Sequence, residues 1–111
     1  MIPYGKQDIN QDDIDAVVNV LKSDYLTQGP AIGQFELSVS EYCGAKFAIA
    51  VNSATSALHI ACLALGVGKG DTVWTSPNSF VASSNCAIYC DATVDFVDID
   101  VETGNISIAS L

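Results

Sequence analysis

The sequence predicts an α/β fold in which two N-terminal helices precede a βαβαβ unit with a mostly parallel sheet. Two observations support this fold class. Apolar residues recur at helical spacing through the first 44 positions, and short apolar segments then alternate with helical ones. Strands joined through helices make right-handed crossovers and pair in parallel. The 111 residues form one domain at most, with an extended arm (1–9), two helices (10–44), the βαβαβ unit (45–100) and a tail (101–111).

Helical signals define the first half of the chain. Asn10 can cap a helix with Asp12 and Asp13 in its first turn. Its apolar face consists of Ile14, Val17, Val18 and Leu21. A polar loop at 23–30 with a Gly-Pro break follows, and a second helix then stops at Gly44. That second helix carries Ile32, Phe35, Val39 and Tyr42 on one face.

The βαβαβ unit begins with a predicted strand at 46–51, followed at once by a helix that ends at Gly66. This helix is apolar on nearly all sides, so we expect it to be buried on more than one side. A second strand at 72–75 leads to Ser79, the expected N-cap of a helix from Phe80 to about Tyr89. A third strand spans 93–97, and a turn at Gly104 precedes the tail.

Polar segments follow each predicted strand, and in parallel sheets ligands bind beyond the carboxyl ends of the strands. We therefore expect residues 52–55, 76–80 and 98–100 to share one rim. At 52–55 the backbone N–H groups and hydroxyls of a helix N-terminus could cradle an anion, phosphate above all, although ordinary helix capping competes with this interpretation. Phe80 is either a core residue, which its type favours, or a flat surface for a planar ring.

Composition excludes several function classes. Thirteen acidic and four basic residues give a formal charge of −9, which repels nucleic acid and anionic membranes. No signal peptide or membrane span is recognisable, so a reducing cytoplasm is the expected location. Four cysteines without a C-x-x-C pair are expected to be structural thiols, not disulfides or metal ligands. His59, without an acidic or histidine partner at helical spacing, is expected to be a packed helix residue.

Asp98 and Asp100 suggest an alternative kind of site. Two carboxylates after an apolar strand could hold Mg²⁺ or act as an aspartyl nucleophile and its acid/base partner, as in haloacid-dehalogenase-type phosphatases. That pattern needs Thr or Val two residues after the second Asp, where this chain has Glu102. A polar strand end is the better interpretation.

Four stretches together resemble one family: YLTQGP at 25–30, NSATSAL at 52–58, TSPNSFVA at 75–82 and VDFVDID at 94–100. They resemble the N-terminal part of the DegT/DnrJ/EryC1/StrS sugar-nucleotide aminotransferases, which use pyridoxal 5'-phosphate (PLP). The resemblance covers essentially the whole chain. It is closest to the subgroup that aminates a UDP-linked 4-keto-6-deoxy-N-acetylhexosamine on the pseudaminic acid route.

The resemblance implies specific roles. Ala54 and Thr55 would hold the PLP phosphate and Phe80 would stack on the pyridine ring. The residues near the sugar-nucleotide substrate would be Tyr4, Asp24, Tyr25, Leu26, Thr27 and Ser53. The amino group would come from glutamate. In the family's large domain, the strand at 46–51 lies at one edge of the sheet and the other two lie toward the opposite edge, with further strands between them.

The resemblance also implies what this chain lacks. The family's Schiff-base Lys and the Asp that pairs with the pyridine nitrogen lie beyond position 111, and none of Lys6, Lys22, Lys46 and Lys69 stands in the Lys motif. We therefore expect an N-terminal segment that is inactive alone and forms a homo-oligomer through its exposed edges. The rival hypothesis is a small non-catalytic α/β protein that self-associates and keeps a phosphate-binding turn.

Overall fold

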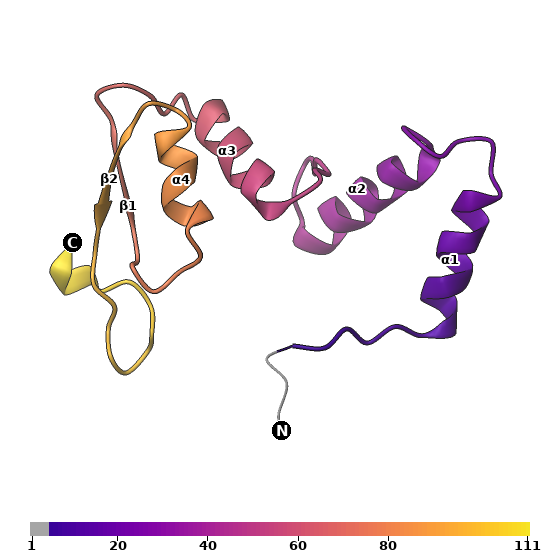
Figure 1. Cartoon of the computed structure of the whole chain (residues 1–111), viewed down its shortest axis with the longest axis horizontal. Helices are drawn as coiled ribbons and strands as arrows, with labels where there is room; N and C mark the ends of the chain where they lie inside the picture. Colours follow the sequence, from indigo (N-terminus) through magenta and orange to yellow (C-terminus); the bar gives the residue numbers. More distant parts are fainter. Residues whose placement is uncertain (1–4) are drawn as a thin grey trace. The chain divides into compact units, whose positions relative to one another are not determined.

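The computed structural model describes residues 5–111 and divides into two compact units, Met1–Ala50 and Val51–Leu111 (Figure 1). The predicted substrate residue Tyr4 lies outside the described residues. The α/β class is confirmed, because helices precede and alternate with a small parallel sheet. None of the helices in the described part of the chain is long and apolar enough to cross a membrane.

The first unit holds the two predicted helices. Helix α1 spans Gln11–Leu21, and the Asn10 side chain accepts hydrogen bonds from the backbone N–H groups of Asp12 (2.8 Å) and Asp13 (3.2 Å). The Asp13 carboxylate accepts the N–H of Asn10 in return at 3.0 Å, which completes a capping box. The predicted start of this helix is therefore confirmed.

Helix α2 spans Pro30–Cys43 and stops at Gly44 as predicted, although it already begins at Pro30, which the prediction placed in the preceding loop. Pro30 occupies the first helical position, where its missing N–H is not needed. Gly44 caps the other end at φ 64°, in the left-handed region that favours glycine.

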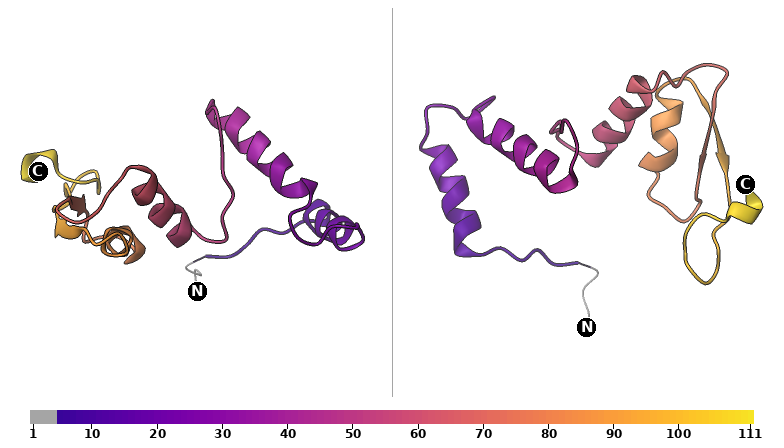
Figure 2. Two further views of the ribbon diagram at one scale, coloured as in Figure 1. Left: turned by 90° about the horizontal axis from the view of Figure 1, so that it is seen from above. Right: turned by 180° about the vertical axis from the view of Figure 1, so that it is seen from behind.

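The second unit is a short α/β layer made of α3 (Ala54–Ala64), β1 (Thr72–Thr75), α4 (Ala82–Ile88), β2 (Thr93–Phe96) and the 3₁₀ turn η1 (Ile108–Ser110). Strands β1 and β2 pair in parallel from Thr72↔Thr93 to Thr75↔Phe96, as predicted. Helix α4 packs on both strands and on α3, so it lies between α3 and the sheet (Figures 1 and 2). The buried apolar residues lie mostly on α4 or at its end: Ala82, Cys86, Ala87, Cys90 and Val97.

The predicted strand at 46–51 is wrong for this structure, because those residues form no strand. A strand exists only where a neighbour accepts and donates its backbone hydrogen bonds, and no described segment pairs with this one. The apolar, β-branched sequence is compatible with a strand but cannot supply the partner.

The prediction that α3 is buried on more than one side is also wrong. Leu58, Ile60 and Leu63 are 39%, 44% and 56% exposed, and α4 is the helix that packs against α3. The apolar composition of α3 therefore exceeds what its neighbours in this structure cover.

The start of α4 differs from the prediction too. The helix begins at Ala82, and Ser79 does not cap it, since the Ser79 hydroxyl pairs with the Ser83 hydroxyl at 2.8 Å. The chain already coils from Phe80, but through tighter bonds such as Ser83 N–H to the Phe80 carbonyl at 2.9 Å. A 3₁₀-like entry turn thus replaces the expected capped start.

Candidate functional site

The turn into α3 leaves two backbone donors open. The Ser53 hydroxyl accepts the N–H of Ser56 at 3.2 Å, and the Ser53 carbonyl accepts that of Ala57 at 3.1 Å. Within the described structure, no hydrogen bond is found for the N–H groups of Ala54 and Thr55. These two donors lie at the positive end of the helix dipole, which favours an anion there.

A small polar network fixes the shape of this turn. The Asn52 side-chain oxygen accepts the Ser56 hydroxyl at 2.7 Å and the Ser53 hydroxyl at 3.5 Å, while the two serine oxygens lie 3.0 Å apart. No role was expected for the Asn52 side chain. The spacing of Asn52 and Ser56, one helical turn apart, is the signal that could have revealed this bond. The network orders the turn before any ligand arrives.

Phe80 lies at the rim and not in the core. Its side chain is 75% exposed, so the core interpretation is wrong, while a role as a flat surface for a planar ring stays a prediction. Phe80 and Phe96 line a hollow of about 180 Å³ together with hydroxyl groups. The hydroxyl-bearing lining residues are Thr75, Ser76, Ser79, Ser83 and Ser84.

The predicted rim is partly assembled. Parallel pairing brings residues 76–80 and 98–100 to the carboxyl ends of neighbouring strands. The amino ends of α3 and α4 lie at the same end of this unit (Figure 1). Residues 52–55 therefore reach that end through a helix start, because no strand precedes them.

The Asp100 carboxylate caps the turn that follows it. Its carboxylate accepts the backbone N–H groups of Glu102 (3.0 Å) and Thr103 (2.9 Å) and the Thr103 hydroxyl (3.1 Å). These bonds, with those from Thr103 the largest contributors, hold the pKa of Asp100 below its ordinary value. The described residues contain no cluster of three metal-ligating side chains. The geometry supports a turn cap at Asp100 and gives no support to a phosphatase site.

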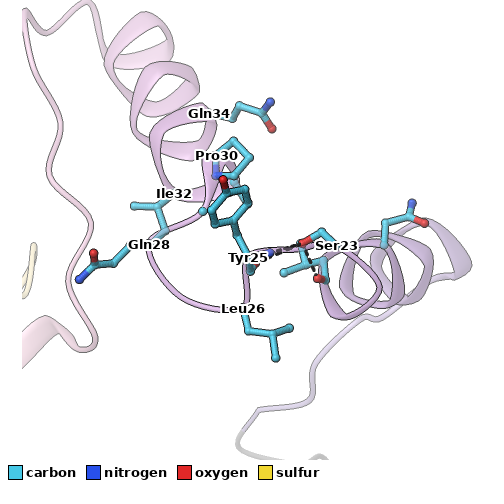
Figure 3. A pocket seen from close by; sticks show the side chains of 11 residues that line it. Ser23, Tyr25, Leu26, Gln28, Pro30, Ile32 and Gln34 are labelled. Atoms are coloured by element: carbon cyan, nitrogen blue, oxygen red, sulfur yellow. Dashed lines mark hydrogen bonds between the residues drawn. The ribbon is translucent and has the colours of Figure 1, made fainter.

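The predicted substrate loop forms a pocket within the first unit. Tyr25 and Leu26 line a hollow of about 250 Å³ between the end of α1 and the start of α2, whereas Asp24 and Thr27 do not line it (Figure 3). The Ser23 hydroxyl bonds to the Val20 carbonyl at 2.8 Å and the Tyr25 carbonyl at 3.1 Å, which fixes the loop. A Cβ at Gly29 would lie 2.9 Å from the Tyr25 Cβ, so this position requires glycine.

The remaining candidates are structural. All four cysteines are free thiols, of which Cys86 and Cys90 are buried and Cys43 is exposed. The pKa of the Cys62 thiol is raised by burial, by a hydrogen bond with Cys86 and by repulsion from Cys86 and Cys90. His59 is half-buried, and its ring centroid lies 5.3 Å from that of Tyr89 in an edge-on arrangement, which agrees with a packed helix histidine.

A model of the DegT/DnrJ/EryC1/StrS aminotransferase family matches residues 7–111. Among characterised relatives, the UDP-4-amino-4,6-dideoxy-N-acetyl-beta-L-altrosamine transaminase of Campylobacter jejuni (strain 81-176) is 47% identical over 96% of this chain and 28% of its own length. The spore coat polysaccharide biosynthesis protein SpsC of Bacillus subtilis is 44% identical over 95% of this chain and 27% of its own length.

Solved structures similar to this chain are also aminotransferases. The putative sugar aminotransferase Spr1654 of Streptococcus pneumoniae, in its PMP form, matches 98% of this chain and 28% of its own with a TM-score of 0.91 and 32% identity. Helicobacter pylori PseC, an aminotransferase involved in the biosynthesis of pseudoaminic acid, matches 98% of this chain and 30% of its own with a TM-score of 0.90 and 35% identity. The chain thus spans somewhat over a quarter of the length of these relatives.

Proposed function

The chain belongs to the DegT/DnrJ/EryC1/StrS aminotransferase family, and from this premise we propose that it is an N-terminal segment that binds the cofactor phosphate and part of the substrate. The whole protein would be a PLP-dependent enzyme that transfers an amino group from glutamate to a nucleotide-linked keto sugar. The observation that carries the proposal is the open pair of N–H groups of Ala54 and Thr55 at the start of α3.

The cofactor side of the site fits PLP in its donor chemistry. A phosphate dianion would accept the N–H groups of Ala54 and Thr55 and the Thr55 hydroxyl, and the helix dipole would stabilise it. The exposed face of Phe80 would stack on the pyridine ring. When bound, PLP supplies an electron sink for the carbon that carries the amino group. This chain's residues bind and orient it.

The substrate side would be formed by the loop before α2. Tyr25 and Leu26 present apolar surface to the pocket at 62% and 65% exposure, which suits the hydrophobic faces of a sugar or a base. We propose that Asp24, Thr27 and Ser53 add polar contacts to the nucleotide sugar, with Tyr4 from the N-terminal arm. The names of the C. jejuni relatives favour a UDP-linked 4-keto-6-deoxy-N-acetylhexosamine as the acceptor.

This chain alone would not transaminate, because by resemblance none of its four lysines stands in the motif of the Schiff-base Lys. We propose that it self-associates, since many large apolar side chains are exposed. We also propose that it acts in the cytoplasm. The rival proposal, a non-catalytic self-associating protein, predicts the same association, and a purely interacting protein without the phosphate-binding turn would show no response to PLP.

Titration with PLP and with inorganic phosphate, followed by equilibrium dialysis and by protection from thermal unfolding, tests the proposal. Thr55→Val should weaken phosphate affinity by about 1–2 kcal/mol, the scale of one hydrogen bond to a charged acceptor. Thr93→Val, an exposed exchange of the same kind on β2, is the matched control and should change nothing. Equal affinity in the wild type and Thr55→Val would remove Thr55 from the site.

A further inference from the structure

Ser83 bonds to the chain on both sides of the Phe80 ring. Its backbone N–H donates to the Phe80 carbonyl at 2.9 Å, and its hydroxyl oxygen lies 2.8 Å from that of Ser79, the residue before Phe80. Ser84, the next residue of α4, instead donates its hydroxyl to the Val81 carbonyl at 2.9 Å. Ser83 therefore closes a short loop within which Phe80 lies.

The Phe80 side chain has little packing of its own to hold it. It is 75% exposed, and residues 76–80 belong to no helix or strand. The rotamers open to a side chain depend on the backbone that carries it, so the direction of this ring depends on how residues 79–83 are held. Ser79, Phe80 and Ser83 all line the hollow of about 180 Å³, so the loop that Ser83 closes is part of its wall.

We propose that Ser83 is a positioning residue for Phe80. Its hydroxyl, bonded to Ser79, keeps the Phe80 ring at the wall of the hollow. A flat heteroaromatic ring that enters the hollow then meets a ring face already in place, without the entropy cost of ordering that side chain. This role toward the cofactor ring rests on the proposed function of Phe80, but the hold on the Phe80 backbone does not. The bond requires a hydroxyl at position 83, which either Ser or Thr supplies.

Side-chain three-bond couplings of Phe80, measured in the ligand-free full chain, report how its χ1 rotamers are distributed. Ser83→Ala removes the hydroxyl and Ser79→Ala removes its partner, so both variants should average these couplings over several rotamers. Ser83→Thr keeps a hydroxyl and should retain the wild-type couplings. Ser84→Ala, half-buried like Ser83 but bonded to Val81, is the matched control for the couplings and should also retain them.

Binding of pyridoxamine 5'-phosphate, followed by its fluorescence, reports on the ring without a Schiff base to a surface lysine, because this probe has no aldehyde. Ser83→Ala should lower its affinity about threefold to tenfold, the scale of one hydrogen bond. The affinity for inorganic phosphate should not change, because phosphate has no ring to stack. In Phe80→Ala, which removes the protein's ring, adding Ser83→Ala should cause no further loss, since the two residues would act as one unit.

Two results would overturn the inference. One is unchanged Phe80 couplings in Ser83→Ala and Ser79→Ala. The other is an equal loss of affinity when Ser83→Ala is added to Phe80→Ala, which would mean that the hydroxyl contacts the ligand itself. Failure of the wild type to bind pyridoxamine 5'-phosphate would instead refute the proposed function. The couplings judge the hold of Ser83 on Phe80 in either case, because they need no ligand.

Discussion

Replacing Ser53 with Asp separates the two roles of the turn into α3. The Ser53 hydroxyl caps the helix by accepting the Ser56 N–H at 3.2 Å, and Asp is an equally good capping residue. A carboxylate at a helix N-terminus also gains about 0.3–1 kcal/mol from the helix dipole. Ser53→Asp should therefore leave the free energy of unfolding unchanged or slightly higher, which ordinary helix capping alone also predicts.

Ser53→Asp should weaken phosphate binding, although it leaves the free energy of unfolding unchanged or slightly higher. A carboxylate about 6 Å from a dianion costs about 1.4 kcal/mol of repulsion even in water, and more near a partly buried surface. Ser53→Asp should thus lower the affinity for inorganic phosphate and for PLP at least about tenfold, and the loss should shrink as added salt screens the charges.

The assay pairs equilibrium dialysis with thermal unfolding followed by circular dichroism. Asn10→Asp, the corresponding change at the N-cap of α1, is the control, and its phosphate affinity should equal that of the wild type. Undiminished phosphate affinity in Ser53→Asp at low salt would refute the argument that the anion binds at the start of α3.

Three further predictions concern the loop, a turn and a thiol. Gly29→Ala forces its new methyl group against the loop and should lower the free energy of unfolding by about 1–3 kcal/mol in thermal melts, whereas Gly33→Ala, in open space within α2, should raise it by about 0.5–1 kcal/mol. Because the folded-state pKa of Asp100 is depressed, its turn is stabilised above the unfolded value of about 3.8 and should loosen as pH falls below it, and Asp100→Asn should abolish this dependence of the turn's amide signals. The raised pKa of Cys62 should make its alkylation by iodoacetamide slower than that of exposed Cys43 at pH 8, and the gap should narrow above pH 9.

Local chemistry explains which features the sequence could predict. The Asn10 cap of α1 and the Gly44 end of α2 depend on residues within one turn of each other, and the structure has both. The parallel pairing of β1 and β2 follows from the crossover helix between them. The turn at 52–55 is also a locally determined feature, since the start of α3 itself fixes the direction of its N–H donors.

The wrong predictions depend on neighbours that a local pattern does not specify. A strand at 46–51 needs a partner strand, and the burial of α3 needs a second packed surface. Residue type alone favours the core for Phe80, but burial depends on what lies opposite the ring, and the side chain is exposed. The hydrogen bond from the Ala50 N–H to the Glu36 carboxylate spans 14 residues, and no spacing rule reveals it.

Features that depend on nearby residues are complete in this chain, whereas features that depend on neighbouring surfaces are not. The proposed phosphate binding at Ala54 and Thr55 would require one helix start and its capping hydroxyl, and the described residues supply both. The apolar sides of α3 and the unpaired segment at 46–51 have the sequence of buried elements without the cover, in a chain that spans about 28% of its relatives. Anion binding should therefore survive in this chain even where stability and transamination depend on additional protein surface, and the two properties can be measured separately.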